Sequence, residues 1–232
     1  DWYVEFAKPI LQGDDEAAKA ETRATAGWVL QQILKILHPI MPFITEELWS
    51  SFGDGKSMLI HAEWPADDIA PINEDAKAEL DWAVRFISEV RTVRSELNVP
   101  AGARIPAILR GASDQTKARL TANEGQIKSM ARIEEILIDA ELPAGAVQTV
   151  LGEATLALPL ADIIDLDAER ARLSKEIDKL AKEITGYDKK LANEAFLAKA
   201  PDAVVEEQHE RRRDAHAAKK KLQSALERLS AA

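Results

Sequence analysis

The sequence contains no cysteine, which excludes disulfide bonds and cysteine-ligated zinc or iron–sulfur sites. It also has no run of about 18 uncharged apolar residues, the length that favours a membrane-spanning helix. No signal peptide is visible and the first residue is Asp1 rather than methionine, so we expect a piece of a longer, cytoplasmic protein. What is present, 46% hydrophobic and 30% charged residues, is typical of a globular protein with a charged helical surface.

The net charge of −10 is unevenly distributed along the chain. Residues 166–232 hold 15 Lys and Arg against 13 Asp and Glu, a net of +2, so residues 1–165 carry −12. An acidic body with a mildly basic C-terminal segment hints that this segment contacts a polyanion, although the excess of positive charge is small.

Residues 1–100 read as helices packed on helices. Apolar residues at helical spacing predict one helix over residues 16–37 and a second over residues 72–97. Asp14 or Asp15 is a candidate N-terminal cap for the first of these helices, and Asn73 for the second.

Between those helices the stretch LHPIMPFITEELW, residues 37–49, is apolar yet carries Pro39 and Pro42. Proline removes a helix donor and clashes with the preceding turn, so one helix must end here and the next must start after a corner. All the tryptophans also lie in the first hundred residues. We expect most of them to pack in the helical core rather than to stack on bases: Trp2, Trp28, Trp49, Trp64 and Trp82.

Residues 101–165 predict a small α/β connector. Short β-like runs, most of them bounded by Gly, Pro or Asp, occur at residues 104–109, 133–139, 146–151 and 154–160. A helix is expected near residues 115–130, between the first two runs. The pair Gly152-Glu153 suggests a tight hairpin between the last two.

From residue 166 the sequence predicts an antiparallel coiled-coil hairpin, which makes the expected fold mainly α. Apolar residues follow the 4, 3 spacing of a coiled-coil seam at Leu173, Ile177, Leu180, Ile184, Tyr187 and Leu191. A return helix is expected after Pro201, and Leu222, Leu226 and Leu229 continue the spacing. The middle of this return arm is less apolar, because its seam positions hold Gln208, Arg212 and Lys219.

No catalytic, cofactor-binding or metal site is expected in this chain. The stretch SFGDGKS, residues 51–57, ends like a P-loop, but Ser50 occupies the position of the first glycine and a helix precedes it instead of a strand. No histidine belongs to a metal-ligand cluster, and His38 reads as a structural corner residue. No Ser/His/Asp arrangement or pair of carboxylates on a cleft is visible.

Basic residues are the remaining candidates for function. Arg211–Arg213 and Lys219–Lys221 form two short runs on the return helix, and lysines line the first helix. The common explanation is a solvated helix surface with Glu–Lys pairs, and the alternative is a polyanion-binding surface. The same ambiguity applies to Arg91 and Arg94, near the end of the long helix.

Four stretches, taken in order, resemble the C-terminal part of the valyl-tRNA synthetase family: DWYVEFAKPIL, ILKILHPIMPFITEELW, EVRTVRSELNVPAGARI and ERARLSKEIDKLAKEI with KLANEAFLAKAPDAVVEEQ. Relatives of HPIMPFITEELW also occur in the isoleucyl and leucyl enzymes, whereas KLANEAFLAKAPDAVV looks particular to the valyl family. The resemblance covers essentially the whole chain. It implies a partial anticodon-binding helical bundle over residues 1–100, whose first helices lie upstream, the α/β connector over residues 101–165, and a coiled-coil tRNA-binding arm over residues 166–232.

The resemblance also implies what this chain does and what it leaves to other domains. Family members join valine to its tRNA with ATP and Mg, but the HIGH and KMSKS activation motifs are absent, so catalysis and editing are expected upstream. The arm is expected to contact the outer corner of valine tRNA, where the D and T loops meet. Candidate tRNA-binding residues are Arg91, Arg94, Arg170, Arg172, Lys175, Lys179, Lys182, Lys199, Arg211, Arg212 and Arg213. Structural roles are expected for Pro39, Pro42, Trp49, Leu173, Ile177, Leu180, Ile184 and Leu191.

Two alternatives to tRNA binding stay open. The hairpin is instead a protein–protein element if its weaker return arm repacks against another chain. A free-standing enzyme is poorly supported, because no catalytic constellation is visible. The expected partners are therefore valine tRNA and the upstream catalytic and editing domains of a monomeric, membrane-free protein.

Overall fold

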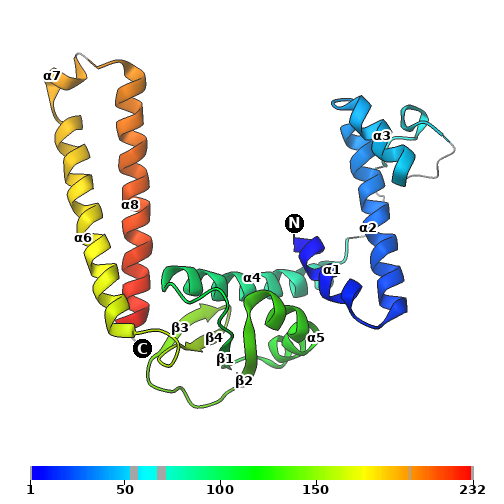
Figure 1. Cartoon of the computed structure of the whole chain (residues 1–232), viewed down its shortest axis with the longest axis horizontal. Coiled ribbons are helices and arrows are strands. Elements are labelled where there is room, and N and C mark those ends of the chain that lie inside the picture. The colour runs from blue at the N-terminus through cyan, green and yellow to red at the C-terminus, as the bar shows by residue number, and fades with distance from the viewer. Residues whose placement is uncertain (1, 53–56, 67–71, 199, 231–232) are drawn as a thin grey trace. The chain divides into compact units, whose positions relative to one another are not determined.

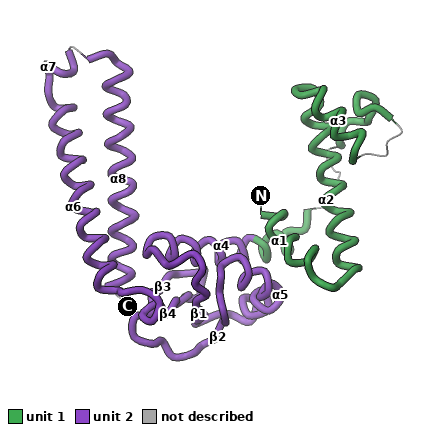
Figure 2. Tube along the Cα trace, in the orientation of Figure 1, with its two compact units in different colours: residues 1–80 green, residues 81–232 purple. Residues whose placement is uncertain are grey.

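The chain folds into two units, and two of its helices begin at capping residues that the sequence predicts. The computed structural model describes residues 2–52, 57–66, 72–198 and 200–230, in two compact units, residues 1–80 and residues 81–232 (Figure 1, Figure 2). The first unit contains α1 (Trp2–Gln12), α2 (Glu16–Leu37), α3 (Pro42–Phe52), the short 3-10 helix η1 (Leu59–His61) and the start of α4 (Glu74–Glu96). Asp15 Oδ1 accepts a hydrogen bond from the Ala18 N–H at 3.0 Å, and Asn73 Oδ1 from the Ala76 N–H at 3.0 Å. Both expected caps are confirmed.

The double-proline segment turns the chain between α2 and α3, as its sequence predicts. Pro39 lies in the turn, and Pro42 is the first residue of α3, where its missing N–H would have had no helical partner. Across the corner, His38 Nδ1 lies 2.9 Å from Thr45 Oγ1, and that hydroxyl also donates to the Met41 carbonyl at 2.8 Å. His38 therefore makes a structural contact at this corner.

Two further side chains attach the segment after α3 to this corner. Trp49 Nε1 donates to the Ser57 carbonyl at 3.1 Å, and Glu46 Oε1 accepts from the Leu59 N–H at 2.7 Å. Trp49 and Leu59 pack with Leu34 of α2 in one buried cluster. The small core of the first unit therefore lies at this corner.

Much of the predicted apolar stripe of α2 is exposed. Leu34 is 2% exposed, but Val29, Ile33 and Ile36 are 38–50% exposed. The described elements of this unit leave that side of α2 open to solvent. The predicted stripe is Ala26, Val29, Leu30, Ile33, Ile36 and Leu37; Leu30 packs partly buried against the core, and the buried Leu34 lies outside this stripe. The tryptophans divide in the same way, since Trp49 and Trp82 are buried whereas Trp28 and Trp64 are exposed.

The second unit contains a four-stranded mixed sheet, and the expected strands are confirmed. The strands are β1 (Ile105–Arg110), β2 (Ile133–Ile138), β3 (Ala146–Leu151) and β4 (Ala154–Pro159), in the spatial order β2-β1-β4-β3. Strands β1 and β2 are parallel and connected through α5 (Asp114–Ala131), whereas β4 is antiparallel to both of its neighbours. Gly152 has φ +65° in the tight turn between β3 and β4.

The second half of α4 packs on this α/β module. Ala83, Ile87 and Val90 of the stripe that the sequence predicts are completely buried, as is Phe86, whereas Leu80 of the same stripe is 48% exposed. Glu89 of α4 also accepts a hydrogen bond from the Thr149 hydroxyl of β3 at 3.0 Å. This packing fixes the C-terminal end of α4 beside the sheet.

Two long helices complete the second unit. Helices α6 (Leu166–Leu191) and α8 (Asp202–Ser230) lie side by side in opposite directions and are joined through the short α7 (Glu194–Leu197) (Figure 1). We call residues 166–230 the hairpin. The chain is thus mainly helical with a small mixed sheet. Coiled-coil geometry in the hairpin and the three-part division at residues 100 and 165 stay predictions.

Candidate nucleic-acid interface

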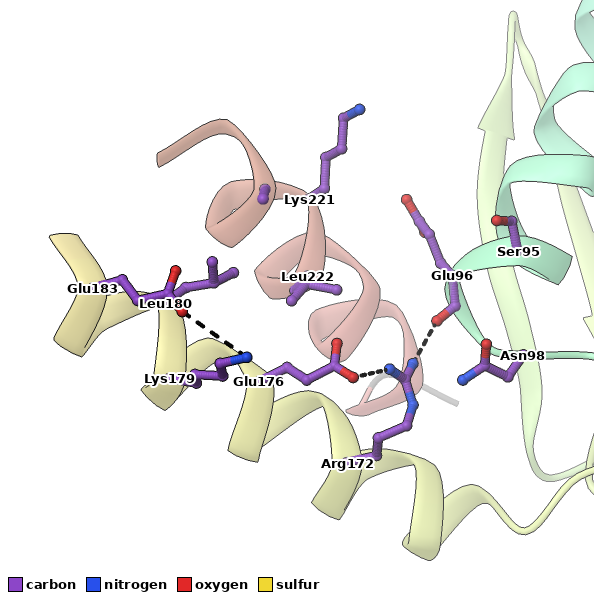
Figure 3. A pocket seen from close by; sticks show the side chains of 11 residues that line it. Ser95, Glu96, Asn98, Arg172, Glu176, Lys179, Leu180, Glu183, Lys221 and Leu222 are labelled. Carbon is purple, nitrogen blue, oxygen red and sulfur yellow. Dashed lines mark hydrogen bonds and ion pairs between the residues drawn. The ribbon is translucent and has the colours of Figure 1, made fainter. Parts of the chain in front are cut away.

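The base of the hairpin and the end of α4 enclose a cleft of about 600 Å³ (Figure 3). Arg172 of α6 lies between Glu176 and the end of α4 in this cleft. Its Nη1 donates to Glu176 Oε1 at 2.7 Å and its Nη2 to the Glu96 carbonyl at 2.9 Å, and Nε donates to Glu169 Oε1 at 2.8 Å. The hydrogen bond with Glu169 is the main cause that raises the pKa of Arg172 above its ordinary value. Arg172 therefore attaches the hairpin to α4.

An ion pair attaches the other long helix to the same end of α4. Arg228, in the last turn of α8, donates from Nη1 to Glu96 Oε2 at 3.0 Å. Burial raises the pKa of Glu96, and the positive charge of Arg228 opposes that rise. Both long helices of the hairpin are thus held to the same residue of α4.

Burial follows the predicted seam in α6 but only in part in α8, where Leu222 and Leu226 are half-buried. In α6, Leu173 and Ile184 are buried and Ile177, Leu180 and Leu191 are half-buried. In α8 the residues most buried are Gln208, Ala215, Ala225 and Leu229. Leu173 and Leu229, both 0% exposed, make the base the best packed part, whereas Gln208 near the tip has a buried Oε1 with no hydrogen-bond partner among the described residues.

Arginines of the hairpin are engaged with protein acceptors. Arg170 pairs with Asp167 at 2.7 Å and also donates to the Leu229 carbonyl at 2.6 Å, across the base. Near the tip, three short ion pairs of 2.6–3.0 Å occupy the run of three arginines: Arg211 with Glu207, Arg212 with Asp188, and Arg213 with Glu206. The pair of Arg212 with Asp188 joins α8 to α6.

Most lysines of the hairpin differ from the arginines in this respect. Within the described residues, Lys175 and Lys182 have exposed side chains and no carboxylate within 4.0 Å, and Lys179 meets Glu183 only at the 4.0 Å limit. These three lysines are four and three residues apart, so they lie on one face of α6. Lys199 lies outside the described residues, as do residues 53–56 of the stretch SFGDGKS.

Arg91 and Arg94 are on α4 rather than on the hairpin. Arg91 donates from Nε and Nη2 to the Met130 carbonyl at 3.1 and 3.0 Å. Arg94 is 8% exposed and donates from Nη2 to the Pro100 carbonyl at 3.0 Å. Burial lowers the pKa of Arg94, and the nearby charge of Arg132 lowers it further.

Sequence reasoning missed three charged residues that organise these sites: Glu96, Arg132 and Arg228. Glu96 and Arg228 are far apart in sequence, and no periodicity links the end of α4 to the last turn of α8. Arg132 follows α5 directly and has φ +55°, a conformation that a sequence pattern reveals only when glycine or asparagine occupies the position.

Neither a metal centre nor a membrane span is found in the described part of the chain. No group of three or more His, Cys, Asp or Glu side chains is placed there to hold a metal ion. No helix among the described residues is both long enough and apolar enough to cross a bilayer. The surface features that remain for function are the charged hairpin and the arginines around the end of α4.

Family models match two segments of the chain. The anticodon-binding domain of tRNA ligases matches residues 1–109, and the valyl-tRNA synthetase tRNA-binding arm matches residues 165–230. The second match covers the hairpin almost residue for residue. The first extends from the helical unit through α4 and into β1.

Curated relatives match over nearly the whole chain. Valine–tRNA ligase of Caulobacter vibrioides is 50% identical over 234 residues, which cover 99% of this chain and 26% of the relative. Those of Brucella melitensis and Rhizorhabdus wittichii are 47% and 51% identical and cover 99% of this chain. The chain spans about a quarter of the length of these relatives.

Proposed function

We propose that this chain, which belongs to the valyl-tRNA synthetase family, is the tRNA-binding C-terminal region of a valine–tRNA ligase. It holds the tRNA while catalytic and editing domains elsewhere in the same cytoplasmic, monomeric polypeptide attach valine with ATP and Mg. The observation that carries the proposal is the hairpin: two long helices, attached to α4 at one end, that match the family's tRNA-binding arm. The chain alone binds tRNA and makes no aminoacyl-adenylate.

The helical first unit is proposed to be part of the anticodon-binding bundle. Its exposed apolar residues, Val29, Ile33 and Ile36 on α2 and Phe43 on α3, form surfaces that the described residues do not cover. Such surfaces mark interaction sites in soluble proteins. In the full protein we expect upstream helices of the bundle to pack there.

Within the hairpin we assign different roles to arginine and lysine. Arg170 and Arg172 hold helices together through ion pairs and carbonyl contacts, so their guanidinium groups are occupied, whereas Arg212 joins α8 to α6 through one exposed ion pair with Asp188. Lys175 and Lys182 have exposed ammonium groups without a described carboxylate, and they are the better candidates for phosphate contacts. Contacts of this kind position an RNA without reading its sequence.

Arg211 and Arg213 are intermediate cases. Both form exposed ion pairs, with Glu207 and Glu206. Exposed pairs contribute only about 0–1 kcal/mol, so an RNA phosphate can replace the carboxylate at small cost. These two arginines therefore stay in the pool of tRNA contacts together with Lys179.

A salt titration of tRNA affinity tests the proposal. Valine tRNA is titrated onto the whole chain and onto a double variant, Lys175→Gln with Lys182→Gln, at several salt concentrations. Each lost phosphate contact should lower the slope of log K against log salt by roughly 0.7–0.9, so the double variant should lose about 1.5. The matched control, Lys175→Arg with Lys182→Arg, keeps both charges and should keep both affinity and slope.

Two outcomes count against the proposal at different levels. If the glutamine variant binds tRNA as the unchanged chain does, the lysines of α6 are not the contacts. If a chain shortened to end at Asp165 also binds with unchanged affinity and slope, the hairpin is not an RNA arm.

A protein–protein role for the hairpin is the second candidate. Near the tip, Leu197 and Val204 are 42% and 38% exposed, and Gln208 is buried with no described hydrogen-bond partner for its Oε1. Repacking of this end against another chain would cover these groups. Light scattering distinguishes the two functions, because a concentration-dependent dimer that Leu197→Lys abolishes would support the interaction role.

A further inference from the structure

Three arginines surround a small pocket beside the end of α4. The pocket has a volume of about 340 Å³, and Arg91, Arg94 and Arg132 line it together with Ser95 and apolar residues of the turn after α4 and of the end of α5. Among the described residues, no Asp or Glu belongs to the lining. Ser95 also lines the cleft at the base of the hairpin, so the two sites are neighbours on the same unit. We call this the arginine pocket.

Arg94 is the residue that points to a ligand. Arg94 is 8% exposed, yet its Nη1 has no hydrogen-bond partner among the described residues and no described carboxylate lies within 4.0 Å of the group. A buried charged donor left unpaired is costly, more so than an exposed one. A structural arginine would be expected to have a carboxylate, as Arg172 has in the cleft next to it.

Arg132 adds a third positive charge in a strained position. It follows α5 with φ +55° and ψ +49°, a left-handed conformation in which glycine is the unstrained residue. Its charge lies close enough to lower the pKa of Arg94, an effect that adds to that of burial. Two like charges are therefore held near each other without a described counter-charge, and an anion would relieve both.

We propose that the arginine pocket binds a phosphate group of the RNA backbone. Guanidinium groups suit this ligand, because their planar pairs of N–H donors match phosphate oxygens in bidentate hydrogen bonds. Arg94 lines the pocket, and its Nη1, although shielded from solvent, has no hydrogen-bond partner among the described residues; Arg132, directly after α5, supplies a further positive charge, and Ser95 lines the same space. The proposal rests on the proposed function for the identity of the RNA. The shared chemistry is that of any phosphoryl oxyanion, so inorganic phosphate serves as the minimal probe.

Arg132→Gly is the main test, because it removes the charge while glycine accepts the left-handed backbone. In the whole chain it should weaken valine tRNA binding roughly tenfold, as for the loss of one charge-assisted contact, and lower the salt slope by roughly 0.7–0.9. The thermal midpoint should not fall. Arg85→Ala, an exposed arginine on the same helix and outside the pocket, is the matched control and should change neither value. Arg94→Lys keeps the charge but loses the fork of donors, so it should also weaken binding.

A second measurement separates the pocket from the proposed function. Inorganic phosphate is titrated into the isotope-labelled chain, and the guanidinium NMR signals of Arg94 and Arg132 are followed. The pocket is supported if both residues show saturable shifts that are lost in Arg132→Gly and kept in Arg85→Ala. This holds even if tRNA does not bind at all, an outcome that would overturn only the proposed function. If phosphate leaves these signals unchanged, or if tRNA binds with the same affinity and slope to Arg132→Gly and Arg94→Lys, the pocket proposal is overturned and the hairpin proposal stands.

Discussion

Truncation of Leu173 to alanine should destabilise the hairpin by about 3–4 kcal/mol, whereas the same change at Leu191 should cost about 1 kcal/mol or less. Leu173 is 0% exposed at the well-packed base, and Leu191, the last residue of α6, is half-buried. Removing about three methylene equivalents from a buried site loses roughly 2.4 kcal/mol of transfer free energy, and an unfilled cavity adds about 1 kcal/mol. At Leu191 the transfer loss is smaller and solvent can fill the space.

Urea unfolding monitored by far-UV circular dichroism measures both variants, and amide hydrogen exchange assigns the loss to α6 and α8. The slope of free energy against urea should stay unchanged, so that the shifts in midpoint report stability. Helix propensity is a minor term, because leucine and alanine differ by only a few tenths of a kcal/mol. An equal loss at the two positions, or a larger one at Leu191, would refute the reasoning that the hairpin is anchored at its base.

Three further predictions follow from single contacts. Gln208→Leu should raise the urea midpoint of the hairpin and its free energy of unfolding by about 0.5–1.5 kcal/mol, because it removes a buried amide oxygen that has no partner among the described residues; a lower midpoint would show that the amide is satisfied in solution. Asp15→Ala should cost about 1 kcal/mol by removing the cap that Ala18 donates to, and Asp15→Asn, which keeps the acceptor, should cost less in the same denaturation experiment. Hydrogen bonds, above all the one from the Thr116 hydroxyl, lower the pKa of Glu153 to about 2 from an ordinary 4.5. The carboxylate therefore stabilises the fold fully at pH above 4.5, and this contribution is lost as the pH falls towards 2. The advantage of the unchanged chain over Glu153→Gln should therefore shrink between pH 4.5 and pH 3, and a constant difference would contradict the assignment.

Local rules placed the bounds of most predicted elements within two residues of those observed, although they gave no sign of the short helix α7. Pro42 had to start a helix or stand outside one, because its ring fixes φ and its nitrogen cannot donate, and it is the first residue of α3. Apolar runs of strand length bounded by turn residues gave the four strands of the sheet. The seam of the hairpin was predictable for the same reason: a 4, 3 repeat places Leu173, Ile177 and Leu180 on one side of α6, and burial agrees.

Local rules could not give the partner of each charged side chain. Arg172 and Lys175 lie three residues apart in the same helix and look alike as candidates, yet Arg172 contacts Glu96, which is 76 residues away, and Lys175 has no described carboxylate. Such pairings depend on how the hairpin meets α4, and no periodicity encodes that. The exposed stripe of α2 failed for a related reason, since an apolar spacing shows that a face needs cover but not which segment supplies it.

The division between arginine and lysine makes stability and RNA binding separable in this hairpin. A guanidinium group can hold a carboxylate and a carbonyl at once, as Arg170 does with Asp167 and the Leu229 carbonyl, so arginines join helices here. A lysine ammonium is a hydrated point charge on a flexible stem, and it suits a phosphate whose position varies. Substitution of Arg170 should therefore lower the midpoint of unfolding first and tRNA affinity only as a consequence. Substitution of Lys182 should lower affinity at unchanged stability, and the order of these two effects is the physical signature of the proposed arm.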